Sequence, residues 1–472
     1  MKTYLDNGAV RVQSYIGRVK SLAARRGASA LLSEATSLPK IESYCKVLAN
    51  RCVEAKPNPG AGVADGVVNL ELDEKSDCRS AAEIVIGELR KRLPAGEFEA
   101  AWGTASSYVE AKVNSIDPMR SRGDGVISLP PQFAWPAAQP CDECGLFPAV
   151  KANRSGTGHQ DAVCTDCCAR LAHGERPTQG RLQELIPDLP EESRASTFDD
   201  LANLGSDSKR NHIALVFLDA NRMGAFFAAL ATSSTNSSKD DLSRAMVTAT
   251  HDALVAATKA VIRAIAGKTN SSPAALPVLA HLVGGDDVLC SVPASFAWLF
   301  TRTYIGSFDE DSEKAVGPHA QGLSCLAPTA SAGMVISHSS FPFARCLDVA
   351  ERNLRLAKRS QAGRKAAVAW QDVTRHGDGA AGPDPLAFED LTALEGSIMA
   401  IHGWPRSAQA NLSALAGRLH GAHAGTQELL TELERTGRFA ALERVTPAEC
   451  PLPTWTAARW VQVLDAARWW YA

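Results

Sequence analysis

The feature that most constrains this fold is the segment His281–Cys290, where two apolar runs flank Gly284–Asp287 (Gly-Gly-Asp-Asp). Glycine and aspartate between apolar runs predict a β-hairpin, because both residues accept the backbone angles of a tight turn. We therefore expect two buried strands with the carboxylates of Asp286 and Asp287 at their tip. Two like charges held this close favour the binding of a cation.

Length and charge narrow the class of protein. The 472 residues are enough for roughly two to four domains. Hydrophobic residues make up 45% and charged residues 21% of the chain, as in ordinary globular proteins. The net charge of −3 gives no overall basic field, so any nucleic-acid-binding surface has to be local. The sequence has no apolar run as long as a membrane span and no signal-peptide core at its start, so we expect a cytoplasmic protein.

Between residues 213 and 370 the apolar pattern predicts the element order β-α-α-β-β-α-β-α-β. This order suits an antiparallel or mixed sheet with helices on one face, the ferredoxin-like layout. Besides the two hairpin strands, strands are expected at Ile213–Leu218, Thr329–Ser337 and Lys365–Trp370. Helices are expected at Met223–Leu230, Leu242–Ala266 and Phe343–Arg359, with a loop at Ser233–Asp241.

The two ends of the chain have different patterns. Val10–Ile16 predicts a strand edge that runs into a basic helix, Gly17–Arg26. Gly66–Leu72 alternates like a half-buried strand, and Ser80–Leu93 has the spacing of an amphipathic helix. Residues 386–472 are predicted to be helical, with four tryptophans that either pack internally or meet a partner: Trp455, Trp460, Trp469 and Trp470.

A third carboxylate could complete the site at the hairpin. Asp219 ends the apolar strand Ile213–Leu218, and in a ferredoxin-like sheet this strand lies beside the hairpin. Asp219 would then face Asp286 and Asp287, and three carboxylates at one edge can hold two divalent ions about 3.5–4 Å apart, as in nucleotidyl transfer. Oxygen ligands suit Mg²⁺ or Mn²⁺. The alternative is that Asp219 caps the following helix and the hairpin aspartates only shape a turn.

Four cysteines predict a metal site. Two Cys-x-x-Cys pairs, nineteen residues apart, suit a closed tetrahedral zinc site whose role is structural: Cys141, Cys144, Cys164 and Cys167. Cys168 and His159 are the alternative ligands if the register slips, and a redox pair is disfavoured because two pairs occur. The remaining, scattered cysteines are interpreted as core residues.

Residues 213–370 resemble the nucleotide-cyclising palm domain of the large subunit of type III CRISPR effector complexes. The shared segments, in the family's order, are Asp219–Gly224, the Gly-Gly-Asp-Asp hairpin, the strand Ser331–Ile336 and Ala357-Lys358 at a helix end. The family's first motif has a second acidic residue where this chain has Asn221, so we carry the metal-binding role to Asp219 alone. A more distant resemblance is to diguanylate cyclases, whose hairpin continues with Glu-Phe instead of Asp287-Val288.

The resemblance implies a reaction in which ATP molecules are joined into cyclic oligoadenylate and pyrophosphate is released. It implies that Mg²⁺ or Mn²⁺ is held by Asp219, Asp286 and Asp287. Gly284 and Gly285 would allow the backbone to approach ions and nucleotide closely. Lys358 becomes the candidate triphosphate ligand, since lysine is a point charge that reaches anionic oxygens. The alternative is a solvated helix end with Arg355 and Arg359 as similar neighbours.

The resemblance covers nearly the whole chain and predicts an α+β protein with two ferredoxin-like palm domains. Residues 1–135 form the first palm-like domain, 136–175 the zinc-binding module, 176–375 the second palm domain and 385–472 the C-terminal helical domain. In the family the helical tail docks small helical subunits, and target RNA bound along the complex releases cyclase activity. The implied partners are therefore other type III effector subunits and, through the complex, guide RNA and target RNA.

Two segments resemble the start of the family's first palm domain. Val12–Ile16 resembles its opening strand, and Arg25–Ser29 resembles its Gly-Ser turn. The family's first palm supplies a second nucleotide pocket, so Ser29 is a candidate contact with a second ATP; a cap or turn serine is the alternative. Many members also begin with a histidine-aspartate nuclease domain, for which the N-terminal third lacks room. The pair His251-Asp252 lies in a predicted helix without neighbouring histidines, so we expect no DNA cleavage.

Two other functions stay open at this point. A catalytically silent scaffold subunit of the same complex is opposed by the intact Asp286-Asp287 pair and allowed by Asn221. A stand-alone synthase of cyclic dinucleotides would work without RNA. The tryptophan-rich tail favours a partner-bound subunit over this second alternative.

Overall fold

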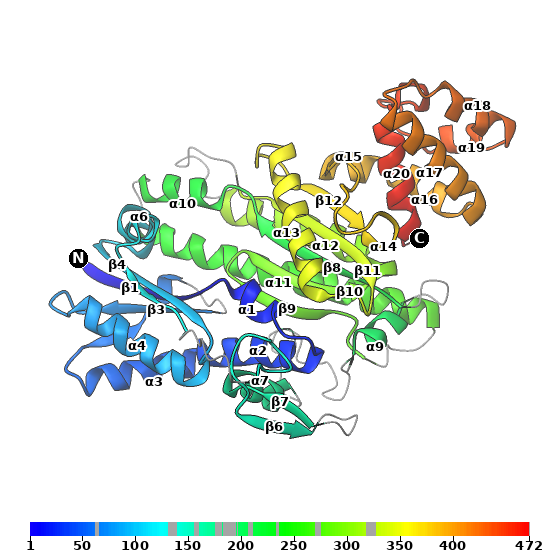
Figure 1. Ribbon diagram of the computed structural model, residues 1–472. Helices are drawn as coiled ribbons and strands as arrows, with labels where there is room; N and C mark the ends of the chain where they lie inside the picture. The colour runs from blue at the N-terminus through cyan, green and yellow to red at the C-terminus, as the bar shows by residue number, and fades with distance from the viewer. Residues whose placement is uncertain are drawn as a thin grey trace.

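The structure is a computed structural model of an α+β protein with two antiparallel-rich sheets and a helical C-terminal part (Figure 1). It describes residues 1–61, 66–130, 139–154, 160–174, 182, 195, 197–205, 211–232, 236–269, 275–317 and 327–471. Within these ranges, every helix is either too short or too polar to cross a lipid bilayer.

The second palm is built on a six-stranded sheet. Its central strands are β8 (His212–Ala220), β9 (Leu279–Gly284), β10 (Asp287–Pro293) and β11 (Ala330–His338). They lie in the antiparallel order β11-β8-β10-β9, which is the ferredoxin-like arrangement, so the predicted adjacency of the first strand and the hairpin is confirmed. β12 (Ala367–Asp372) extends the sheet parallel to β11, and β13 (Leu386–Ala387) ends it.

Helices cover both faces of this sheet, not one face as expected. Alternate residues of β8 divide between the two sides: Val216 and Leu218 pack with α11 (Asn236–Thr269) and α12 (Ala297–Val316). Leu215 and Phe217 pack with α13 (Phe343–Ser360) and with helices of the first palm. A strand that is apolar on both sides needs cover on both sides, and here the second cover comes partly from a distant part of the chain.

The expected loop at Ser233–Asp241 is also wrong in part, because α11 begins at Asn236. Serine and asparagine favour turns on local grounds. Here the first turns of α11 pack against the first palm at η1 (Pro59–Ala61) and α5 (Tyr108–Ala111). Such tertiary packing overrides weak local preferences.

The first palm repeats the same arrangement. Its strands β1 (Lys2–Val10), β2 (Ala55–Pro57), β3 (Val67–Leu72) and β4 (Glu97–Ala105) lie in the antiparallel order β2-β3-β1-β4, and β5 (Val126–Ser128) is added at the edge. β3 and α4 (Cys78–Arg92) confirm the predicted strand and amphipathic helix. The remaining helices of this part are α2 (Leu22–Ala35), α3 (Leu38–Ala49) and α6 (Asp117–Arg122).

The predicted strand edge at Val10–Ile16 is wrong. The strand ends at Val10, the chain turns at Arg11 with φ +53°, and α1 (Val12–Gly17) follows. Tyr15 and Ile16 are buried while Val12 packs against the same core, which is the i, i+3, i+4 spacing of a helix. The segment is short, so the periods of a strand and a helix both fit it.

The palms and the cysteine module share packing contacts. Leu215, Phe217 and Val335 of the second sheet lie in one core cluster with residues of α2 and β3 of the first palm. In the cysteine module, β6 (Lys151–Arg154) pairs with β7 (Gln160–Val163), and α7 (Thr165–Gly174) lies along α2. Gly27 and Gly174 allow this approach, since a Cβ on either would lie within 2 Å of a carbonyl oxygen of the other helix.

The C-terminal part is helical, as expected from its pattern. It contains α15 (Phe388–Ala393), α16 (Glu395–His402), α17 (Arg406–Gly421), α18 (Gln427–Arg435), α19 (Phe439–Glu443) and α20 (Ala457–Trp469). The four tail tryptophans are buried in the chain's own core, and Trp469 Nε1 donates to Asp372 Oδ2 at 2.9 Å. Their abundance is explained by internal packing and no longer argues for a partner.

Candidate functional site between the two palms

The hairpin at the centre of the site has a two-residue loop. Gly284 pairs with Asp287 across the ladder, which leaves Gly285 and Asp286 to make the turn. Gly285 has φ +60°, a left-handed angle that favours glycine at the first loop position of a hairpin. The turn therefore holds the two carboxylates at the end of a rigid, buried pair of strands, as the sequence predicts.

Asp219 lies where it was expected. Leu218 of β8 pairs with Val288 of β10, so the next residues outward, Asp219 and Asp287, are neighbours across the ladder. On its other side Asp219 pairs with Ser331 of β11. The Asp219 side chain does not cap the following helix, which was the alternative, because its carboxylate forms an ion pair with Lys358.

Lys358 reaches the site from the last turn of α13. Its Nζ pairs with Asp219 Oδ2 and also donates to the carbonyl oxygen of Ala220 at 2.9 Å. Gly333 of β11 allows α13 to lie this close, since a Cβ there would be 2.2 Å from the carbonyl oxygen of Ala350. Lys358 is thus directed to the carboxylates and is not a freely solvated helix end.

The electrostatics of the site favour a cation. Desolvation in the cleft, followed by repulsion from Asp219, raises the pKa of Asp286 to about 7. The same causes, with Asp286 added, raise the pKa of Asp287 well above its ordinary value. Carboxyl groups that resist ionisation beside one another are stabilised as carboxylates when a divalent ion binds them.

The residues present fit such ions by the chemistry of their donors. Three carboxylates from two adjacent strands meet at one edge, and the Lys358 ammonium already acts there as a cation beside Asp219. The aspartate oxygens are not as close together as in a one-ion site: within the described ranges, only the cysteine group has ligand atoms all within 4.8 Å of one another. Ligands of a two-ion site spread over a wider distance, because the ions are about 3.5–4 Å apart.

Asn221, the departure from the family's motif, has a structural role. It is buried, and its amide Nδ2 donates to Thr329 Oγ1 at 2.9 Å and to the carbonyl oxygen of Lys365 at 3.2 Å. These bonds tie the end of β8 to the segments that precede β11 and β12. The side chain therefore fixes the turn that follows Asp219.

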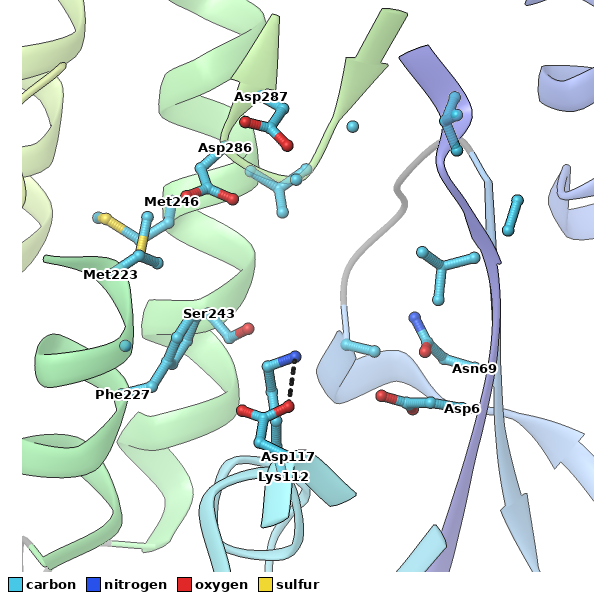
Figure 2. A pocket seen from close by; sticks show the side chains of 18 of the residues that line it. Asp6, Asn69, Lys112, Asp117, Met223, Phe227, Ser243, Met246, Asp286 and Asp287 are labelled. Atoms are coloured by element: carbon cyan, nitrogen blue, oxygen red, sulfur yellow. Dashed lines mark ion pairs between the residues drawn. The ribbon is translucent and has the colours of Figure 1, made fainter. Parts of the chain in front are cut away.

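The hairpin opens onto a cavity of about 500 Å³ between the two palms (Figure 2). Gly284, Gly285, Asp286 and Asp287 lie at one end of it. One wall is largely apolar and comes from α10 (Met223–Thr232) and α11, with Met223, Phe227, Ser243, Met246 and Val247. The opposite wall belongs to the first palm and is polar, with Asp6, Asn69, Tyr108, Lys112, Asp117 and Arg120. This volume lies in the range of pockets that hold small molecules.

The polar wall was not identified from the sequence. Asp6 and Asn69 are buried residues of β1 and β3, and they are direct partners across the strand ladder. A usable signal was present, since each polar side chain is buried within a strand, which is unusual unless it has a partner. Neither strand carries a known motif, and for that reason the signal was missed.

Ser29, the candidate contact of the first palm, lies within α2 and not in a turn. It is not among the residues that line the cavity. The helix continues through Arg25–Ser29 because Gly27 packs against α7, so the glycine serves a helix contact. His251 and Asp252 lie on α11, and Asp252 is exposed, as expected for a helix surface.

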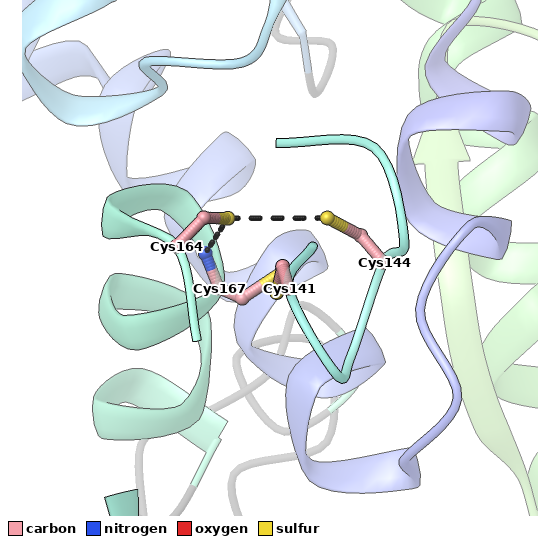
Figure 3. Close-up of side chains that lie close together, drawn as sticks. All are labelled: Cys141, Cys144, Cys164 and Cys167. Atoms are coloured by element: carbon pink, nitrogen blue, oxygen red, sulfur yellow. Dashed lines mark hydrogen bonds between the residues drawn. The ribbon is translucent and has the colours of Figure 1, made fainter. Parts of the chain in front are cut away.

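The four cysteines form the predicted cluster (Figure 3). The Sγ atoms of Cys144 and Cys164 are 3.9 Å apart, close to the roughly 3.8 Å edge of a tetrahedron with Zn–S bonds of about 2.3 Å. Cys168 is not part of the cluster, and His159 lies outside the described residues. Hydrogen bonds between neighbouring thiols lower the pKa of Cys144 and raise the pKa of Cys164 and of Cys167, so these three thiols lose their protons together only around a cation. The residues fit a structural zinc ion.

Comparison with known proteins agrees with this fold. Residues 212–369 match the family model of Cas10/Cmr2, second palm domain. No curated protein gives a significant match to the sequence. Among solved structures, the fold is similar to the Csm1-Csm4 cassette in complex with cA4, with a TM-score of 0.53 and 13% identity over 99% of this chain and 69% of that chain.

Two further structures have the same fold. One is the Csm1-Csm4 cassette in complex with AMPPNP, with a TM-score of 0.53 and 15% identity over 99% of this chain and 70% of that chain. The other is Csm1 in T. onnurineus, with a TM-score of 0.51 and 14% identity over 99% of this chain and 70% of that chain. At these identities the likeness establishes the fold.

Proposed function

We propose that this chain, a Cas10-like protein by its second palm domain and its fold, is the nucleotidyltransferase subunit of a type III CRISPR effector complex. Its reaction would join ATP molecules into cyclic oligoadenylate when target RNA is bound to the complex. The observation that supports the proposal most directly is that Asp219 lies beside the hairpin aspartates Asp286 and Asp287, which line one end of a cavity between the two palms.

The residues of the site suit the roles that this reaction requires. The 3′-hydroxyl of one ATP attacks the α-phosphate of another, and pyrophosphate leaves. Asp219, Asp286 and Asp287 would hold Mg²⁺ or Mn²⁺, which when bound supply an activated hydroxyl and neutralise phosphate charge. Lys358 would turn from Asp219 to the triphosphate once the carboxylate binds an ion. Gly284 and Gly285 add no side chain between nucleotide and backbone.

The partners are proposed on the same basis. Two of the structures with this fold are Csm1-Csm4 cassettes, and one of them holds cA4. We propose that other type III effector subunits bind this chain and that guide RNA and target RNA reach it through the assembled complex. A zinc ion in the cysteine module would be structural, since four cysteine ligands leave no open coordination position.

The test uses the complex assembled with its partner subunits and guide RNA. It is incubated with ATP and Mg²⁺ or Mn²⁺, with and without target RNA, and the products are analysed by mass spectrometry. We expect cyclic oligoadenylate from the wild type and none from the double variant Asp286→Ala, Asp287→Ala with unchanged thermal unfolding. The exposed Asp252→Ala on α11 is the matched control and should keep full activity.

Each other outcome has a definite meaning. Unchanged synthesis by the double variant would refute the metal-binding roles. A correctly assembled wild-type complex that makes no product would favour the silent scaffold. Product from the isolated chain without RNA would favour a stand-alone synthase.

A further inference from the structure

The polar wall of the cavity contains buried hydrogen-bonding atoms without partners. Asp6 and Asn69 are 1% and 7% exposed, and they face each other across β1 and β3. Within the described part of the chain, the Oδ1 atoms of both side chains accept no hydrogen bond. Buried polar atoms are nearly always paired in folded proteins, so two unpaired acceptors beside each other indicate a ligand with donor groups.

The other oxygen of Asp6 is fully used, which fixes the direction of the free one. Tyr108 Oη donates to Asp6 Oδ2 at 2.9 Å, and Arg120 Nη2 lies 3.8 Å from the same oxygen. The nearby cation Lys112 pairs with Asp117, at 3.7 Å. Figure 2 shows Asp6 and Asn69 side by side on the strands of the first palm, directed into the cavity and across from the apolar wall.

We propose that Asp6 and Asn69 read the base of a nucleotide in this cavity and select adenine, which carries a 6-amino group, over guanine, which carries a 6-oxo group; the inference rests on the proposed function. The Asn69 amide offers one acceptor and one donor, which match the N6 amino group and N7 of adenine. The free Asp6 oxygen accepts the second N6 hydrogen. Guanine carries the acceptor O6 at the same position and would face two acceptors.

The apolar wall completes the recognition. Phe227, Met223 and Met246 lie across the cavity from the two polar side chains (Figure 2). A purine between the walls would stack its face on apolar side chains and place its edge against Asp6 and Asn69. The triphosphate would then extend towards the end of the cavity that is lined by Asp286 and Asp287.

The test compares nucleotides in the assembled complex. Rates of product formation, as kcat/KM, are measured with ATP, with GTP and with purine riboside triphosphate, which lacks the 6-amino group. We expect the wild type to prefer ATP over both by at least about 100-fold, since a site built to hydrogen-bond a group rejects an analogue without it. Asn69→Ala should reduce the preference over purine riboside triphosphate by about 5- to 150-fold.

A second variant should change the preference in the opposite sense. Asp6→Asn keeps an acceptor for Tyr108 and presents an amide donor to the cavity, so it should raise the use of GTP relative to ATP at least tenfold. Glu71→Gln is the matched control, because Glu71 also lies on β3, but its carboxylate pairs with Lys2 and Lys56 and does not line the cavity. It should leave all ratios unchanged.

Binding provides a readout that does not need turnover. The affinities of AMPPNP and GMPPNP for the complex are measured by calorimetry for the wild type and for both variants, and their ratio should shift as the rates do. If the wild type makes no product, the proposed function fails, while the binding ratio still tests the role of Asp6 and Asn69. If product forms but neither variant changes the ratio of rates or the ratio of affinities, the base-reading role is overturned. It is also overturned if kcat/KM falls further with 2′-deoxy-ATP than with purine riboside triphosphate.

Discussion

At the scale of single residues, the pair of Lys358 with Asp219 is the most informative contact of the site. Lys358 is partly exposed, and its ammonium is held by a carboxylate and by the carbonyl oxygen of Ala220. A lysine that already lies beside the proposed ion site is well placed to meet an incoming triphosphate. The contact also shows that the Lys358 ammonium compensates the charge of Asp219 when no divalent ion is bound.

We expect Lys358→Ala to raise the KM for ATP more than it lowers kcat. A hydrogen bond to a charged group contributes about 1.5–3 kcal/mol, which corresponds to a rise in KM of about 10- to 150-fold. Steady-state kinetics of product formation in the assembled complex measure the effect. Arg355→Ala on the same helix is the control, because Arg355 is exposed and forms an ion pair with the neighbouring Glu351. Equal kinetics for the two variants would make Lys358 an ordinary helix-end lysine.

The second prediction at this scale concerns His281 and pH. This side chain is 1% exposed, its Nε2 hydrogen-bonds with Ser291 Oγ at 2.7 Å, and the Phe343 ring lies 4.8 Å away. Burial, aided by the charge of Arg25, lowers its pKa to about 3. An unfolded histidine takes up a proton near pH 6.5. Between these values the unfolded chain binds one more proton, so the free energy of unfolding falls as the pH falls.

We therefore expect a loss of stability below pH 6.5 of up to about 1.4 kcal/mol per pH unit from this group. Denaturant unfolding at pH 7.5, 6 and 5 measures it. His281→Gln should be less stable than the wild type at pH 7.5, and the difference should shrink towards pH 5. The exposed His420→Gln on α17 should track the wild type at every pH. A difference that is constant with pH would contradict a neutral, buried His281.

At the scale of elements, the second cysteine pair connects the metal site to the first palm. Asp166 lies between Cys164 and Cys167 at the start of α7, and its Oδ2 is 2.7 Å from Arg170 Nε and 3.0 Å from Arg18 Nη2. Arg170 is fully buried and stacks on the Tyr15 ring at 3.8 Å. The carboxylate thus joins α7 to α1, whose first residue lines the cavity between the palms.

Removing the Asp166 carboxylate should lower the free energy of unfolding strongly. Asp166→Ala leaves the Arg170 guanidinium buried without its counter-ion, which typically costs about 3–5 kcal/mol of unfolding free energy. Denaturant unfolding measures the loss, and elemental analysis should find zinc still bound. Asp142→Ala, in the other cysteine pair, removes an exposed carboxylate that accepts a hydrogen bond from the Ala162 amide and should cost far less. Equal losses would show that Asp166 has no special role.

The metal site itself gives a related expectation. Cys141→Ser should lose zinc and lower the melting temperature, because a four-cysteine site contributes directly to folding. Cys45→Ser, an isolated half-buried cysteine of α3, should keep the metal. A wild-type protein that contains no metal and is as stable as Cys141→Ser would refute the site.

The sequence predicted the elements whose signals are local. The hairpin, the strand that ends at Asp219 and the helix that ends at Lys358 follow from apolar runs bounded by turn residues. The helix α1 and the start of α11 were missed, because their conformation depends on packing against distant segments. Periodicity over six residues cannot separate a strand from a helix, and a serine-rich segment is helical here only through its contact with the first palm.

At the scale of the whole molecule, the cavity exists only because the two palms share a core. The hairpin supplies one end and α10 and α11 supply the apolar wall. The polar wall comes from β1 and β3 together with α5 and α6. Adjacency within one sheet was predictable from the strand order, and it brought Asp219 to the hairpin. The packing of the two palms against each other could not be predicted from the strand order. Asp6 and Asn69 therefore could not be assigned to the same site as the hairpin.

The spacing of the palms depends on a contact that admits no side chain. Gly60 of η1 is buried, and a Cβ there would lie 2.5 Å from Cγ of Asp240 on α11. The Asp240 carboxylate also accepts hydrogen bonds from the backbone amides at the start of α5, so it cannot easily move away. Ala61, the next residue, and Ser243, one turn along α11, both line the cavity. A push at Gly60 therefore separates the walls of the proposed nucleotide site.

We expect Gly60→Ala to weaken AMPPNP binding to the complex at least about tenfold, while the cost in unfolding free energy stays in the about 1–3 kcal/mol range of an overpacked contact. Gly87→Ala is the matched control, since Gly87 is exposed on α4 with no atom within 4 Å of an added Cβ. It should keep full affinity and gain about 0.5–1 kcal/mol from higher helix propensity. If Gly60→Ala binds AMPPNP as tightly as Gly87→Ala, the distance between the palms is not set at this contact, and the cavity tolerates their separation.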